Sequence, residues 1–280
     1  MKKLIIALLT LVLFTSCGSN ADDSKVKVGD VYYSDGTTAH VDSRNKSKDN
    51  QVAGFVVSVK KDKPAVIMCR KVKEEGRTNW RYYMTNKTRK DCFPSQHVFD
   101  SNGNELSKTD VNGKDSYSQY LSQEDSVKNT CVYYRWIDSL NNPEDTNYIA
   151  LPDGAEWYIP TMFELKAAKD KKGNYPYLKS LENFQKGKND SEINELCGKK
   201  ISLERQDENY YSVFYVLQSS TLRLSPSGND PEGTQLLELL AYIDEPYPRY
   251  GNIYDRKWTD DLIAIDDPVD VLWVAFAEVN

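Results

Sequence analysis

The sequence predicts an α+β fold, in a single domain that covers residues 26–280. Three observations lead to this prediction. Strand patterns rich in Val lie near both ends of the mature chain, at 52–69 and 271–279. Helical patterns with capping residues lie between them, at 122–140 and 162–171. No linker rich in Pro, Gly or Ser divides the sequence into two parts.

The composition excludes several classes of protein. Apolar residues make up 39% and charged residues 28% of the 280 residues, which excludes a membrane protein with many spans. The 19 Tyr, within 11% aromatic residues, are more than a disordered chain carries. The net charge of −6 argues against a general nucleic-acid-binding protein. Because His40 and His97 are the two histidines, a histidine metal cluster or a Ser-His-Asp triad is disfavoured.

Residues 1–17, MKKLIIALLTLVLFTSC, have the pattern of an export signal. Lys2 and Lys3 precede an apolar run that is shorter than the ~20 residues needed to span a bilayer as a helix. The run ends in Phe14-Thr15-Ser16-Cys17, which resembles a bacterial lipobox. This resemblance implies that Cys17 is lipid-modified and begins the mature protein. An ordinary cleaved signal beside a chance cysteine is the alternative.

Residues 18–25 are then a polar tether between the lipid and the domain. Within it, Asp22 and Asp23 resemble the surface-export signal of Bacteroidetes lipoproteins. The expected location is therefore the bacterial cell envelope, as an outer-membrane lipoprotein held to the membrane by its N-terminal lipid. Surface exposure and the leaflet are left open.

The first part of the domain has the patterns of strands. Val26 to Tyr33 alternates between apolar and polar residues and runs into a turn at 34–36. Residues 37–50 have no periodicity and predict an exposed loop. Val52 to Val59 and Ala65 to Cys69 flank a short polar turn, which predicts a hairpin.

The middle of the domain predicts helices. Residues 71–116 are mostly polar and predict irregular structure with short strands at most. Ser122 is followed by acidic residues and predicts the N-cap of one long helix that ends at Leu140. Thr161 predicts the N-cap of a helix from Met162 to Lys171. Further elements are expected at 157–159 (strand), 177–186 and 191–197 (helices), 210–218 (strand), 225–268 (irregular insert) and 271–279 (strand).

Four cysteines follow Cys17. An exported protein can form disulfides, and four thiols allow three pairings; four buried or free thiols are the alternative. Their spacing matches no zinc motif, and residues 100–105 resemble the start of a calcium loop but predict a turn. We therefore predict no metal and no cofactor. The cysteines are Cys69, Cys92, Cys131 and Cys197.

Three segments resemble a known family. Residues 28–37 (VGDVYYSDGT), 156–165 (EWYIPTMFEL) and 215–221 (YVLQSST) are similar to motifs of the C-terminal domain family of Legionella collagen-like proteins. That family has no assigned function and is common in Bacteroidetes surface proteins. The terminal VLWVAFAEV at 271–279 is similar to its last strand. The resemblance implies a C-type-lectin-like fold, with two or three helices and a long variable insert.

The motif residues also have structural interpretations of their own. Trp157 and the residue two positions on would point inward from a strand packed against a helix. Pro160 fixes φ at the strand–helix junction, and Thr161 and Glu164 can form a capping box. The hydroxyl-rich segment would satisfy buried backbone groups where the insert leaves the sheet. Its members are Ser219, Ser220 and Thr221.

The insert is the predicted binding region. Its aromatic rings can stack on a sugar or pack against a protein, and its charged groups can contact hydroxyls or ions. Alternatively, the rings pack the loop onto the body of the domain. The candidate ligand-binding residues are Tyr242, Asp244, Tyr247, Arg249, Tyr250, Tyr254 and Trp258.

These observations predict a non-catalytic, lipid-anchored binding module that presents the aromatic loop to a glycan or protein at the cell envelope. A structural subunit of an envelope assembly is one alternative. An envelope enzyme is a second alternative, although no catalytic residue is predicted.

Overall fold

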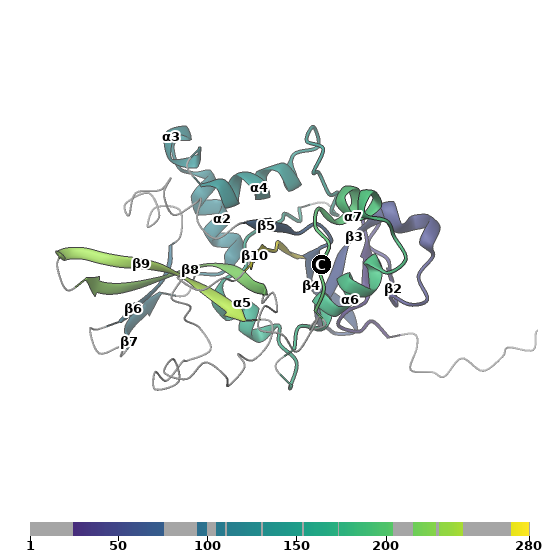
Figure 1. Ribbon diagram of the computed structural model, residues 1–280, viewed down its shortest axis with the longest axis horizontal. Helices are drawn as coiled ribbons and strands as arrows, with labels where there is room; N and C mark the ends of the chain where they lie inside the picture. Colours follow the sequence, from purple (N-terminus) through teal and green to yellow (C-terminus); the bar gives the residue numbers. More distant parts are fainter. Residues whose placement is uncertain are drawn as a thin grey trace, which may run out of the picture.

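The fold is described from a computed structural model of the chain (Figure 1). The structure describes residues 25–75, 94–99, 105–109, 111–129, 131–152, 154–172, 174–203, 215–227, 230–242 and 270–279. The strands are β1 (Val31–Tyr33), β2 (Thr38–Ala39), β3 (Val52–Lys60), β4 (Lys63–Cys69), β5 (Lys73–Glu75), β6 (Ser95–Phe99), β7 (Glu105–Thr109), β8 (Tyr215–Ser227), β9 (Asp230–Tyr242), β10 (Asp270–Trp273) and β11 (Phe276–Glu278). The helices are the 3-10 helix η1 (Lys46–Gln51), α2 (Gly113–Leu121), α3 (Asp125–Lys128), α4 (Val132–Asn141), α5 (Met162–Ala167), α6 (Pro176–Gln185) and α7 (Asp190–Cys197).

The first sheet is antiparallel, with strand order β11-β4-β3-β1-β2. The predicted hairpin is confirmed as β3 and β4. Lys61 and Asp62 form its turn with φ values of 52° and 60°, as a tight turn matched to the strand twist requires. The predicted turn after β1 is also present, where Gly36 has φ 84° and the Asp35 side chain accepts from the Thr37 N–H. The alternating pattern from Val26 overestimates β1, which starts at Val31.

The second sheet has strand order β5-β10-β8-β6-β7, with β9 paired to β8. Strand β8 runs parallel to both β10 and β6. Strands β8 and β9 form a long hairpin that projects from the body beside β6 and β7 (Figure 1). The prediction of irregular structure from 225 is therefore wrong for β9. Its Pro and Gly lie near the hairpin end of the strand, where they disturb the ladder least.

The chain passes twice from one sheet to the other. The first crossing leads from β4 in the first sheet to β5 in the second. The second crossing leads from β10 in the second sheet, which pairs with β5, to β11 in the first sheet, which pairs with β4. The prediction of one strand over 271–279 is therefore wrong. At the crossing, the Val274 C=O accepts from the Tyr133 hydroxyl at 2.7 Å, and the Ala275 C=O accepts from the Cys69 N–H at 2.8 Å. Both carbonyls are satisfied there without a continuous ladder.

The prediction of one continuous helix over 122–140 is also wrong, although its predicted end at Leu140 lies within one residue of the end of α4. Ser122 is the C-cap of α2 rather than an N-cap, and the following helical pattern divides into α3 and α4. The break falls at Cys131, whose φ of −88° and ψ of 79° are not helical. Helix α2 was not expected, since its start lies in the segment predicted to be irregular. The helices predicted after residue 160 are confirmed as α5, α6 and α7, although α5 ends early, at Ala167.

The segment 37–50, predicted to be an exposed loop, contains β2 and η1 and is anchored by a buried ion cluster. Arg44 Nε donates to Asp49 Oδ1 at 2.9 Å, and Lys188 Nζ lies 2.5 Å from Asp49 Oδ2. Both cations also lie over the Phe184 ring of α6. Burial alone would raise the pKa of Asp49, but the hydrogen bonds from the two cations outweigh it and hold the pKa below its ordinary value.

One cluster of buried side chains connects the two sheets and the helices. It is unusually aromatic, because many of the tyrosines are inside rather than on the surface. Tyr120, Tyr134, Tyr158 and Tyr177 are among its fully buried members. Helices α2 and α4 lie together on one side of the molecule, and α6 and α7 lie near the first sheet (Figure 1). The predicted α+β class is confirmed.

Candidate functional site

Much of the predicted site lies outside the described residues. Tyr242 is the last residue of β9. The other predicted ligand-binding residues, Asp244, Tyr247, Arg249, Tyr250, Tyr254 and Trp258, lie outside the described ranges, as do the signal segment with Cys17, and Cys92. The aromatic loop and the lipid anchor therefore stay predictions.

The motif at 156–165 begins with a short segment that links the first sheet to α4. Tyr158 pairs with Phe276 of β11 through two hydrogen bonds, of 2.8 and 2.9 Å. The Asn141 side chain bonds both the N–H and the C=O of Trp157, and Trp157 Nε1 donates to the Ile149 C=O at 3.0 Å. The expectation that only alternate residues of this segment point inward is wrong, since Trp157, Tyr158 and Ile159 are all buried. All three can be buried because helices and strands surround this segment.

The Glu164 carboxylate joins two helix N-termini. As predicted, Thr161 and Glu164 form a capping box at the start of α5. Glu164 Oε2 accepts from the Thr161 N–H at 2.8 Å, from the Thr161 hydroxyl at 2.9 Å and from the Gly113 N–H of α2 at 3.0 Å. Burial raises the pKa of Glu164, and these hydrogen bonds oppose the increase. The side chain thereby ties α2 to the motif.

Gly113 allows this close approach. A Cβ atom at this position would lie 2.3 Å from the Ile159 C=O oxygen and 2.4 Å from the Tyr158 ring. The first turn of α2 therefore rests directly on Tyr158 and Ile159 of the motif segment. The sequence contained a signal for this helix start, because Asn112 accepts from the Asp115 N–H as an N-cap.

The predicted role of the hydroxyl segment is confirmed for Ser220. Its N–H donates to the Pro160 C=O at 2.8 Å, and its hydroxyl donates to the Ile159 C=O at 3.2 Å. Ser219 is also buried, and Thr221 pairs with Ser95 at the start of the β6–β8 ladder. The motif residues thus act as scaffold, and we find the candidate binding surface elsewhere.

The cysteines divide into two groups. Cys131 is disulfide-bonded, and its partner lies outside the described residues. Cys69 and Cys197 are free and buried, so none of the three complete pairings of the four thiols occurs, and the alternative of four free thiols is also wrong because Cys131 is bonded. Burial raises the pKa of Cys69 to about 12 and that of Cys197 to about 11, so both remain protonated thiols at neutral pH.

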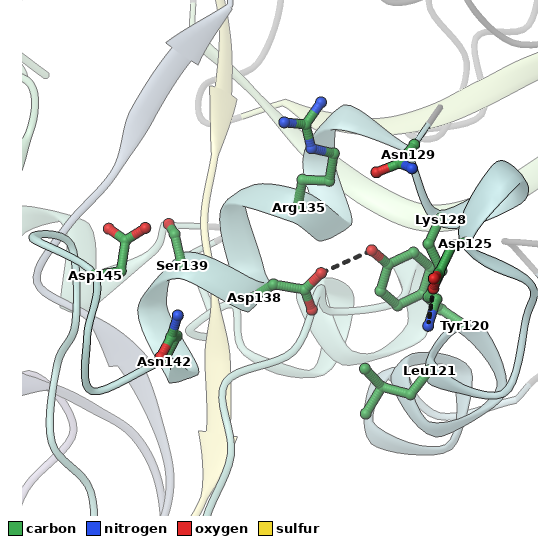
Figure 2. Close-up of a pocket in the computed structure, with 10 residues that line it drawn as sticks. All are labelled: Tyr120, Leu121, Asp125, Lys128, Asn129, Arg135, Asp138, Ser139, Asn142 and Asp145. Atoms are coloured by element: carbon green, nitrogen blue, oxygen red, sulfur yellow. Dashed lines mark hydrogen bonds and ion pairs between the residues drawn. The ribbon is translucent and has the colours of Figure 1, made fainter.

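A polar pocket of about 380 Å³ opens beside α4, with lining residues from α2, α3 and the turn after α4 (Figure 2). Sequence reasoning did not single it out. We call it the α4 pocket and define it by Tyr120, Leu121, Asp125, Lys128, Asn129, Arg135, Asp138, Ser139, Asn142 and Asp145.

Asp138 is fixed in the α4 pocket by two tyrosines. It accepts from the Tyr117 hydroxyl at 2.8 Å and from the Tyr120 hydroxyl at 2.7 Å. The two rings stack on each other and on Tyr134, with the Tyr120 and Tyr134 centroids 4.4 Å apart. Burial raises the pKa of Tyr117 and of Tyr120, and the Asp138 carboxylate adds to the increase. Both phenols therefore stay protonated and keep donating to Asp138.

Two cations line the same pocket. Lys128 lies 3.0 Å from Asp125, three residues earlier in α3. Arg135 is exposed on α4, and its guanidinium forms no hydrogen bond or ion pair with any residue that the structure describes. Figure 2 shows Arg135 and Asp138 on neighbouring turns of α4. The α4 pocket thus offers a fixed acceptor beside a donor that has no partner among the described residues.

Within the described ranges, no group of three or more His, Cys, Asp or Glu side chains is placed to hold a metal ion. The helices of the described part include none that is long and apolar enough to cross a bilayer. No protein-family model, curated protein or solved structure matches this chain significantly.

Proposed function

We propose that this protein is a non-catalytic, lipid-anchored binding module of a bacterial cell envelope, with a C-type-lectin-like fold. The observation that carries the proposal is the α4 pocket, an open polar surface with Arg135 unpaired among the described residues and Asp138 held in place. Pockets of roughly 300–1,000 Å³ with a few fixed polar groups are typical ligand sites. The aromatic loop at 242–258 remains a proposed second contact with a glycan or protein.

The disulfide at Cys131 supports the envelope location. Disulfides persist in exported proteins and are rare in the cytosol, where thiols are kept reduced. This agrees with the export pattern of residues 1–17. The scaffold role of Thr161, Glu164 and Ser220 supports the C-type-lectin-like proposal, since those residues carry the family resemblance and are used to join helices and sheet.

The anchor is tested in a Gram-negative host that expresses the full chain. We expect mass spectrometry to find a lipid-modified N-terminal cysteine at Cys17 and fractionation to place the protein in the outer membrane. Cys17→Ala should abolish both results, and the neighbouring Ser16→Ala serves as the matched control. An unmodified mature N-terminus would refute the anchor.

The binding role is tested with the detergent-solubilised full chain against purified envelope polysaccharide and protein fractions. We expect saturable binding to one of them. Replacing Tyr247, Tyr250 and Trp258 together with Ala should weaken that binding if the aromatic loop contributes. Unchanged binding removes the loop from the site, and the absence of binding to every fraction refutes the module.

A further inference from the structure

We propose that the α4 pocket binds a neutral sugar, with Arg135 as hydrogen-bond donor and Asp138 as acceptor. This inference rests on the proposed binding function and names its ligand class. Sugar hydroxyls donate and accept at once, so they need donors and acceptors side by side. Arg135 and Asp138 lie three residues apart on α4, which places them next to each other on one helix face.

The charges of the pocket favour a neutral ligand. Its lining carries the carboxylates of Asp125, Asp138 and Asp145 and the cations Lys128 and Arg135, so its net charge is 2 − 3 = −1. Asp125 and Lys128 already pair with each other. An anionic ligand bound to Arg135 would be repelled by the neighbouring Asp138 carboxylate. A cationic ligand bound to Asp138 would be repelled by Arg135 in the same way. A hydroxyl-bearing ligand meets no such repulsion.

Asp138 has capacity left for a ligand. An ionised carboxylate accepts about four hydrogen bonds, and the two tyrosine hydroxyls use two of them. The stacked tyrosine rings hold the carboxylate in place before the ligand arrives, which lowers the entropy lost on binding. Arg135 supplies up to five N–H donors.

The pocket also offers an apolar contact. Leu121, the last residue of α2, is 43% exposed at the rim of the pocket. An exposed apolar side chain beside polar groups suits the C–H face of a pyranose ring, which is apolar between its hydroxyls. The volume of about 380 Å³ is at the lower end for ligand sites, which suits one or two sugar units rather than a large ligand.

The test uses the detergent-solubilised full chain on an array of neutral, uronic-acid and sialylated oligosaccharides, followed by calorimetry with the best neutral ligand. We expect binding to neutral sugars. Arg135→Ala should weaken it about tenfold or more, since a hydrogen bond to a charged group is lost. Lys171→Ala, an exposed cation on the loop after α5, is the matched control and should leave affinity unchanged.

Each other outcome overturns the inference. Neutral-sugar binding that survives Arg135→Ala moves the site away from this pocket and leaves the binding module standing. Binding restricted to acidic oligosaccharides contradicts the neutral ligand. No binding to any oligosaccharide, together with binding to an envelope protein fraction, rejects the sugar but keeps the module. Equal urea midpoints for wild type and Arg135→Ala verify that the variant is folded.

Discussion

Replacing Glu164 with Ala should destabilise the protein more than loss of an ordinary helix cap. The substitution removes the acceptor of the Thr161 and Gly113 N–H groups, which start two different helices. Each donor left unsatisfied costs about 1–3 kcal/mol, with the lower part of that range applying where water can enter. Glu164 is only partly buried, so we expect a loss of about 2–4 kcal/mol in the free energy of unfolding.

The chain contains a matched control for this prediction. Asn189 and Glu192 form a second capping box at the start of α7, but Glu192 is exposed and, among the described residues, its side-chain hydrogen bonds stay within the first turn of its own helix. Glu192→Ala should therefore cost about 1 kcal/mol, as an isolated cap does. Urea unfolding followed by circular dichroism gives both values when the m-value is unchanged. A Glu164→Ala loss no larger than that of Glu192→Ala would refute the two-helix role.

Glu164→Gln separates the hydrogen bonds from the charge. The bonds from Thr161 and Gly113 all reach Oε2, so an amide oxygen can replace that acceptor, and we expect a loss of about 1 kcal/mol or less. Because burial raises the Glu164 pKa in the folded state, stability from its protonated form is lost as pH rises through that pKa. Glu164→Gln lacks this loss, so the difference in unfolding free energy between the variant and the wild type should narrow from pH ~4 to neutral pH. A gap that widens instead would show that ionised Glu164 is preferred.

Three further predictions concern the core and the cysteines. Asp49→Ala should cost about 3–5 kcal/mol of unfolding free energy at neutral pH, because it leaves buried Arg44 and half-buried Lys188 without their carboxylate partner. The folded pKa of Asp49 is lowered, so this difference in stability should shrink as pH falls through that pKa. A pH-independent difference in urea midpoints would contradict the ion cluster. Gly113→Ala should lower stability by about 1–3 kcal/mol despite the better helix propensity of Ala, and a more stable variant in the same assay would contradict the close approach. Alkylation mapped by mass spectrometry should modify Cys69 and Cys197 only after unfolding and Cys131 only after reduction, and labelling of Cys131 without reductant would contradict its disulfide.

Local patterns predicted the elements that depend on neighbouring residues. The β3–β4 hairpin follows from two apolar runs and a polar turn, and the start of α5 follows from Thr161 and Glu164 three residues apart. The bounds predicted for the two helices after α5 also agree with α6 and α7 to within one residue at each end. In these cases the determining interactions lie within a few positions of each other, so a single sequence contains them.

The features that the sequence failed to predict have a different cause, since those features depend on contacts between residues far apart in the chain. The apolar run from Val271 has the same local pattern whether it forms one strand or two strands in different sheets. The crossing between the sheets depends on hydrogen bonds from Tyr133 and Cys69, which lie elsewhere in the chain. Helix α2 buries Tyr117 and Tyr120 rather than aliphatic residues, so its amphipathic pattern is weak. The second acceptor role of Glu164, toward Gly113, has no local signature at all.

The α4 pocket forms because the segment predicted to be one long helix is divided into α3 and α4. In one continuous helix Asp125 and Asp138 would be separated by roughly 20 Å along the axis, at 1.5 Å per residue, and could not line one small pocket. The break at Cys131 lets α3 turn away from the axis of α4, so that Lys128 and Asp138 line the same space. Because the broken backbone is held by a disulfide-bonded residue, reduction should loosen α3 relative to α4. Ligand affinity at the pocket should therefore fall on reduction, and an affinity that is unchanged by reductant would contradict this coupling.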